Sequence, residues 1–142
     1  MDLDLDLWIT RIDDNVDDLH GRVSGAAELA AVRESAQTTP AAWVIPVADD
    51  AGGNVLLNAV SQRVTERIGI VFAVRNVRDK RGATAHNALR AIRRAVKNTL
   101  IGWLPDPDEA AVVFSRGRLI DFSDRVIWWQ DEYLWAYEER KT

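Results

Sequence analysis

The most regular pattern in the chain is an apolar stripe at helical spacing between residues 82 and 103. Apolar side chains recur there every three or four positions, as they do along the buried face of an amphipathic helix. The stripe consists of Ala85, Leu89, Ile92, Val96, Leu100 and Trp103. Gly102 is a suitable C-terminal stop, and Pro105 and Pro107 prevent the helix from continuing. We therefore predict a helix over residues 82–103.

The N-terminal segment carries both an alternating and a helical pattern. Leu3, Leu5 and Leu7 alternate with aspartates as in a strand, but the longer stretch fits a helix better. Along that stretch, one helix face collects Leu5, Trp8, Ile9, Ile12, Val16 and Leu19. The first aspartates then lie in the first turns, where the helix dipole favours negative charge. We predict one helix that ends before Gly21, then a short extended piece and a second helix over residues 26–35.

Runs rich in β-branched residues predict strands between and after the helices. Residues 41–47 form a short apolar run typical of a buried strand, and residues 49–54 give a strong loop signal. Residues 55–77 are rich in Val and Ile and predict either one long bent strand or a strand pair. Two further strands are expected at residues 111–122 and 126–137. The chain therefore alternates helices with strands whose pairing the sequence does not specify.

These elements predict one α+β domain over all 142 residues, with a mixed, mostly antiparallel sheet flanked by two to three helices. A hydrophobic fraction of 47% with 28% charged residues is typical of a folded globular chain. Cysteine is absent, which excludes a disulfide framework and a thiolate zinc site. No apolar run approaches the roughly 18–20 residues that a membrane-spanning helix needs. We expect a soluble protein without membrane contact, folded in a cytoplasm.

Motifs for catalysis or metal binding are missing. The two histidines, His20 and His86, have no second ligand at a suggestive spacing. The first three aspartates imitate the start of a calcium loop, but Leu7 stands where the glycine of that loop should follow. Gly52-Gly53-Asn54 lacks the ending of a phosphate-binding loop. A hydrolase would require one of the many carboxylates to lie in an apolar pocket with a raised pKa. We predict no enzymatic activity and no cofactor or metal.

Charge is segregated along the chain, although the net charge is only −4. Residues 1–18 hold seven aspartates against one arginine, and residues 106–139 hold nine acids against three arginines. Between these acidic blocks lie the candidate basic residues for the lining of a channel through which DNA passes, or for contact with an acidic partner: Arg78, Lys80, Arg81, Arg90, Arg94 and Lys97. A helix flank neutralised by the acidic strands of the same domain is an equal alternative. The net negative charge of the domain and the lack of a recognition motif argue against sequence-specific DNA binding.

The last predicted strand is rich in aromatic residues. With alternating orientation, one face of this strand carries Trp129, Tyr133, Trp135 and Tyr137. Aromatic side chains are enriched both in cores and at protein interfaces. We take this strand as the first candidate for a contact between subunits.

Several short motifs follow one another from about residue 8 to residue 140. They are Gly25-Ala26-Ala27-Glu28-Leu29, Thr39-Pro40-Ala41-Ala42-Trp43-Val44-Ile45-Pro46, Gln62 before a Val/Ile strand, Gly102-Trp103-Leu104-Pro105, Gly117-Arg118-Leu119 and Trp128-Trp129-Gln130-Asp131. This ordered series resembles the small tail terminator, or tail completion, proteins of long-tailed bacteriophages. The motif residues look like determinants of the fold, because they are turn glycines, prolines and packing tryptophans.

The resemblance implies a mixed sheet flanked by helices and a role in the virion tail after assembly in the host cytoplasm. It implies a hexameric ring at the head-proximal end of the tail, which ends tube polymerisation and joins the head. The implied partners are further copies of the chain, the tail tube protein and the head–tail connector protein, with DNA touched only non-specifically in the lumen. Two other classes stay open: a different head–tail connector or adaptor, and a small nucleic-acid-binding module.

Overall fold

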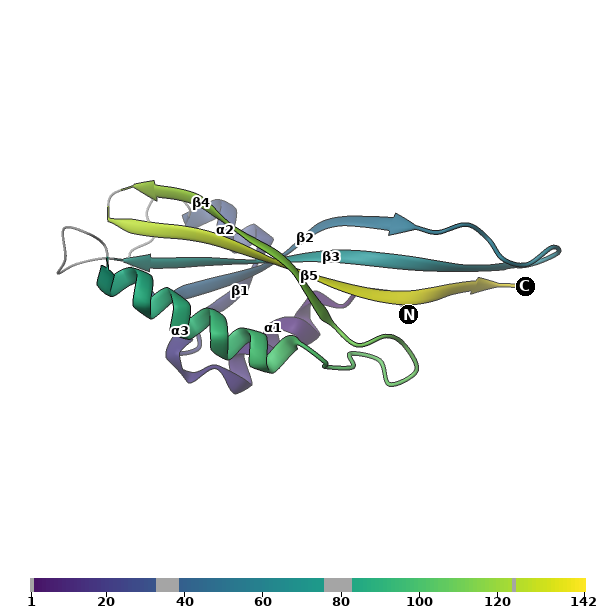
Figure 1. Ribbon diagram of the computed structural model, residues 1–142, viewed down its shortest axis with the longest axis horizontal. Helices are drawn as coiled ribbons and strands as arrows, with labels where there is room; N and C mark the ends of the chain where they lie inside the picture. Colours follow the sequence, from purple (N-terminus) through teal and green to yellow (C-terminus); the bar gives the residue numbers. More distant parts are fainter. Residues whose placement is uncertain (1, 33–38, 76–82, 124) are drawn as a thin grey trace.

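The computed structural model describes residues 2–32, 39–75, 83–123 and 125–142 (Figure 1). In chain order its elements are α1 (Leu5–Asn15), the short 3-10 helix η1 (Asp17–Leu19), β1 (Val23–Gly25), α2 (Ala26–Val32), β2 (Ala41–Ala51), β3 (Val60–Arg75), α3 (Ala83–Leu100), β4 (Val113–Ser123) and β5 (Val126–Lys141).

The strands form one five-stranded sheet in the order β1-β2-β3-β5-β4. β1 runs parallel to β2, and the other neighbouring strands are antiparallel. α1 and α3 pack against one face of the sheet, whereas α2 lies on the opposite face (Figure 1). The predicted α+β class, with a mostly antiparallel sheet and flanking helices, is therefore confirmed.

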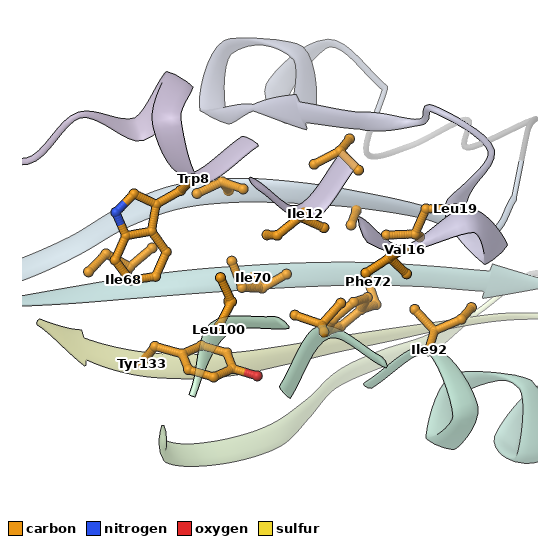
Figure 2. Packing of buried hydrophobic residues seen from close by; sticks show 14 of the residues in the cluster. Trp8, Ile12, Val16, Leu19, Ile68, Ile70, Phe72, Ile92, Leu100 and Tyr133 are labelled. Carbon is orange, nitrogen blue, oxygen red and sulfur yellow. The ribbon is translucent and has the colours of Figure 1, made fainter. Parts of the chain in front are cut away.

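The main hydrophobic core lies between the sheet and the layer formed by α1 and α3. Trp8 and Ile12 of α1 and Ile92 of α3 pack with Phe72 and Tyr133 of the sheet (Figure 2). All five side chains are at most 3% exposed. Each fully buried side chain of this kind contributes about 1.5–3 kcal/mol through the hydrophobic effect. The apolar stripe predicted for residues 82–103 is the face that α3 buries here as far as Leu100, where the helix ends; Trp103 packs against the core from the segment that follows, and residue 82 lies outside the described residues.

The first helix is shorter than the sequence pattern indicated. α1 begins after Asp4, whose carboxylate accepts hydrogen bonds from two backbone N–H groups of the first turn. It ends at Asn15, and Val16 leaves the helical conformation (φ −121°, ψ 89°) before η1. The prediction of one helix up to Gly21 is wrong at this point. The break still buries Val16 and Leu19, because three-residue spacing in the 3-10 turn keeps both on the core side.

The predicted loop at residues 49–54 is also partly wrong. Asp49, Asp50 and Ala51 continue β2 and pair with residues 64–66 of β3. Their side chains face water, so polar residues are tolerated in a strand that pairs with β3 along one edge. β3 is one continuous strand of 16 residues, so the single-strand alternative is correct for residues 60–75, whereas residues 55–59 form a loop and residues 76–77 lie outside the described residues.

The ends of three strands extend well beyond the helices as a narrow ribbon (Figure 1). We call this ribbon the arm; it comprises residues 48–67 of β2, β3 and their connection, and residues 134–141 of β5. The eight residues 60–67 of β3 correspond to a projection of roughly 25 Å at about 3.3 Å per residue. Residues 52–59, the tip loop, close the far end of the arm.

Candidate interaction surfaces

One flank of α3 presents a group of basic side chains to solvent. Arg90 and Arg94 are exposed, and Lys97 is half-buried with its Nζ 4.2 Å from the ring centroid of Phe114. Burial lowers the pKa of Lys97, and the positive charge of Arg93 lowers it further. These residues line a hollow of about 350 Å³ together with Asn87, Ala91 and Arg93. We call this surface the basic flank.

Three of the six predicted basic residues, Arg90, Arg94 and Lys97, thus lie together on α3. The other three, Arg78, Lys80 and Arg81, lie outside the described residues.

Arg93 differs from its neighbours because its guanidinium turns toward the sheet. It binds both carboxylate oxygens of Asp131 at 2.8 Å and lies 4.5 Å from the ring centroid of Trp129. The indole Nε1 of Trp129 donates a further hydrogen bond of 2.8 Å to Asp131, which is 0% exposed. The alternative in which an acidic strand of the same domain neutralises the charge of the helix flank therefore holds for Arg93. In the described part of the chain, Arg90 and Arg94 form no ion pair.

A glycine of β4 makes room for this ion pair. Gly117 is paired with Asp131 across the two strands. A Cβ atom built on Gly117 would collide with the carboxylate of Asp131 and would lie 2.9 Å from Nη2 of Arg93 and 3.0 Å from Nε1 of Trp129. Two sequence motifs, 117–119 and 128–131, therefore meet in one packed cluster. Only the register of β4 against β5 reveals this contact.

A second buried carboxylate lies next to the first but points to the other face of the sheet. Glu132 is 1% exposed and accepts bonds from Arg67 of β3 and Arg116 of β4, both at 3.1 Å, and from Gln130 at 2.9 Å. Burial alone would raise the pKa of Glu132, but these three donors outweigh it and hold the pKa below its ordinary value. The sequence analysis missed this network, which ties β3, β5 and β4 together.

Comparison with known proteins decides the class of this chain. A family model described as "Phage tail terminator protein" matches residues 1–142. The chain belongs to the phage tail terminator family. It is a structural protein of the phage tail, as the sequence motifs indicated.

The fold of this family member has a counterpart in a solved particle. A chain of the "Virion of native gene transfer agent (GTA) particle" superposes with a TM-score of 0.52 at 14% identity, and the match covers 93% of this chain and 90% of that chain. At this identity the likeness shows a shared fold. Among curated proteins, none matches this chain.

The aromatic face of β5 lies inside the terminator fold. Tyr133, Trp135 and Tyr137 are at most 6% exposed and belong to the main core, and Trp129 is half-buried beneath Arg93. The alternation that placed these rings on one face is correct, and their packing partners are in the same chain. We therefore base the contacts proposed below on other residues.

One acid of the arm has the raised pKa that hydrolytic chemistry would require. Burial raises the pKa of Glu66, and the negative charge of Asp49 raises it further. The hydroxyl of Tyr137 donates a 3.3 Å hydrogen bond to Glu66, and burial together with this carboxylate raises the pKa of Tyr137 to about 12. Glu66 does not line the hollow of the basic flank. We assign Glu66 no chemistry.

The described residues contain no group of three or more His, Asp or Glu side chains placed to hold a metal ion. Among the described helices, none is both long and apolar enough to cross a bilayer.

Proposed function

We propose that this tail terminator family member caps the head-proximal end of the tail tube as a ring of six copies. The ring ends tube polymerisation and forms the joint to the head connector, and it assembles in the host cytoplasm. The observation that carries this proposal is the match of the tail terminator family along the whole chain. The partners are further copies of the chain, the tube protein and the connector protein.

The charge distribution of the helical layer supports ring formation. α1 and η1 expose an acidic ridge formed by Asp13, Asp14, Asp17 and Asp18. On the same face of the sheet, α3 exposes Arg90 and Arg94. In the described part of the chain, neither group is neutralised by an ion pair. Two different patches of opposite charge on one molecule favour head-to-tail contacts, which close into rings when the rotation between copies allows it.

The basic flank also suits a surface that DNA passes. Arginine and lysine side chains contact phosphates without reading the base sequence. The flank carries no aromatic stacking platform on its exposed side, since Trp129 and Phe114 lie beneath Arg93 and Lys97. Non-specific, salt-sensitive contact with DNA is therefore the expected behaviour.

The direct test is to add the purified protein to assembling tail tubes and to measure tube length by negative-stain electron microscopy. We expect tubes of bounded length with extra density at one end. Uncapped tubes, with the protein left free in solution, would remove the terminator role and would favour another connector or a DNA-binding role.

A further inference from the structure

The side chains of α3 that are charged at pH 7 are all basic and are grouped on one side of the helix. They are Arg90, Arg93, Arg94 and Lys97, spaced three and four residues apart. Like charges at this spacing are neighbours on a helix and destabilise it, and α3 contains no Asp or Glu that could offset them. The helix therefore concentrates positive charge at a cost to its own stability, and this favours a negatively charged partner outside it.

The sheet beneath α3 neutralises little of this charge. Within the described residues, the carboxylate of Asp131 already accepts hydrogen bonds from Arg93 and from the indole of Trp129. Its negative charge raises the pKa of Lys97, but burial and the positive charges of Arg93 and Arg94 outweigh it and keep that pKa below its ordinary value. The hollow of the basic flank is therefore left with an excess of positive charge.

The shape of this hollow suits a small anion. Its volume of about 350 Å³ lies at the lower end of the range of about 300–1,000 Å³ that is usual for small-ligand sites. Arg90, Arg94 and Lys97 all line it. A guanidinium donates two parallel hydrogen bonds to an oxyanion, and an ammonium group adds a compact charge. A phosphate group has enough oxygens to accept from three such cations at once, whereas a carboxylate has only two.

We propose that the hollow of the basic flank is a binding site for one phosphate group, with Arg90, Arg94 and Lys97 as its ligands. Arg93 forms a fixed wall of the site, because Asp131 holds its guanidinium. A phosphodiester of DNA and a free phosphate ion present the same kind of oxygens to these residues. The site rests on the proposed function only for its source of phosphodiesters, the DNA that passes this surface.

The first experiment titrates the purified chain with inorganic phosphate at constant ionic strength and follows the NMR signals of the arginine Nε–H groups. We expect saturable shifts at Arg90 and Arg94 that fit one site per chain. Acetate is the matched probe for a carboxylate partner. Absence of saturation would overturn the site. Acetate binding as tight as phosphate binding would overturn the phosphate class and would indicate a carboxylate partner, such as the acidic ridge of another copy.

Two single substitutions test the ligands. Lys97→Met keeps an apolar stem beside Phe114 and removes the charge, and Arg94→Gln removes an exposed charge without touching the core. Each should weaken phosphate binding about tenfold, since each removes a charge-assisted hydrogen bond. The control, Lys141→Met, removes an exposed charge at the end of β5 and should bind as the wild type does. Equal weakening in the control would show that net charge, and not the hollow, attracts the ion.

A DNA duplex of mixed sequence tests whether the arginines share one phosphate. The slope of log K against log salt changes by about 0.9 for each phosphate that a protein neutralises. Arg90→Gln with Arg94→Gln should therefore reduce the slope by about 0.9 in total if both side chains bind the same phosphate. A reduction of about 1.8 would mean two separate contacts and would overturn the shared site.

Competition identifies the source of the phosphate. Displacement of the duplex by inorganic phosphate at constant ionic strength would support the site with DNA as its source. Phosphate binding without duplex binding would support it with the free ion as its source. Binding of the duplex that phosphate does not displace and that Lys97→Met does not weaken would overturn it.

The capping assay separates this site from the proposed function. Tube capping by a wild-type chain that binds no phosphate would overturn the site and leave the terminator role standing. Phosphate binding by a chain that leaves the tubes uncapped would overturn the terminator role and leave the site standing.

Discussion

The hydrogen atom in place of a side chain at Gly117 allows β4 to lie directly beside the buried pair of Arg93 and Asp131. A methyl group at this position would collide with the Asp131 carboxylate and crowd Nη2 of Arg93. We expect Gly117→Ala to lower the free energy of unfolding by about 3 kcal/mol, because it disturbs a buried ion pair and overpacks its surroundings. Chemical denaturation measures this difference.

Gly53→Ala is the control for this substitution. No atom lies within 4 Å of a Cβ atom built on Gly53. Its free energy of unfolding should stay within about 1 kcal/mol of the wild-type value. Equal stability of the Gly117 and Gly53 variants would show that the ion pair does not require the glycine.

Glu66 makes the stability of the arm depend on pH. Burial and the charge of Asp49 raise its pKa above the ordinary value of 4.5. When the folded pKa of an acid is raised, ionisation opposes folding, and stability is lost as the pH rises above the unfolded pKa. Glu66→Gln cannot ionise and still accepts the hydrogen bond from Tyr137. We expect its thermal unfolding midpoint to exceed that of the wild type at pH 7, and the difference to vanish below about pH 4.

Thermal scans across this pH range decide the point, with the exposed Glu139→Gln as the control that should follow the wild type. A Glu66→Gln midpoint below the wild-type midpoint at every pH would show that the carboxylate forms a net favourable contact.

At the scale of elements, α3 serves two purposes on two faces. Its apolar stripe fixes the helix on the sheet, while Arg90 and Arg94 lie outside that stripe and are exposed. Reversal of both charges, Arg90→Glu with Arg94→Glu, should change the free energy of unfolding by no more than about 0.5 kcal/mol. The same variant should cap few tubes, because its flank then repels the acidic ridge of the next copy.

Circular dichroism melts and counts of capped tubes measure these two effects. The matched control, Arg125→Glu with Lys141→Glu, changes the net charge equally at exposed positions away from α3 and should cap normally. Unfolding of the α3 variant would make its arginines structural, and normal capping by it would remove the basic flank from the interface.

The elements differ in how far the sequence could predict them. α3 was predictable because its stripe, its glycine stop and its prolines are all local signals. The break after Asn15 was not, since α- and 3-10 helices place Val16 and Leu19 on nearly the same side. The continuation of β2 through Asp49 depends on pairing with β3, which local polarity conceals.

The same limit applies to the surfaces. Exposure of Arg90 and Arg94 follows from helical periodicity. The inward turn of Arg93 depends on Asp131, which lies 38 residues further along the chain. Pairings of this kind depend on strand order and register, and a single sequence gives neither.

For the whole molecule, salt distinguishes charged from apolar contacts between copies. The acidic ridge and the basic flank are exposed, so their attraction is screened as the Debye length falls from about 30 Å at 0.01 M to about 3 Å at 1 M salt. Capping by the wild type should therefore weaken as salt is raised. In the variant with Arg90→Glu and Arg94→Glu, the flank repels the ridge, and screening should improve capping.

Capping by the wild type should thus fall as salt is raised, whereas capping by the α3 variant should rise. The control with Arg125→Glu and Lys141→Glu should follow the wild type. Counts of capped tubes over a salt series measure all three. Apolar contacts between copies are not weakened by screening, because hydrophobic burial carries no net charge. Parallel salt responses of the wild type and the α3 variant would mean that the ring is held by apolar contacts and not by the charged faces of the helical layer.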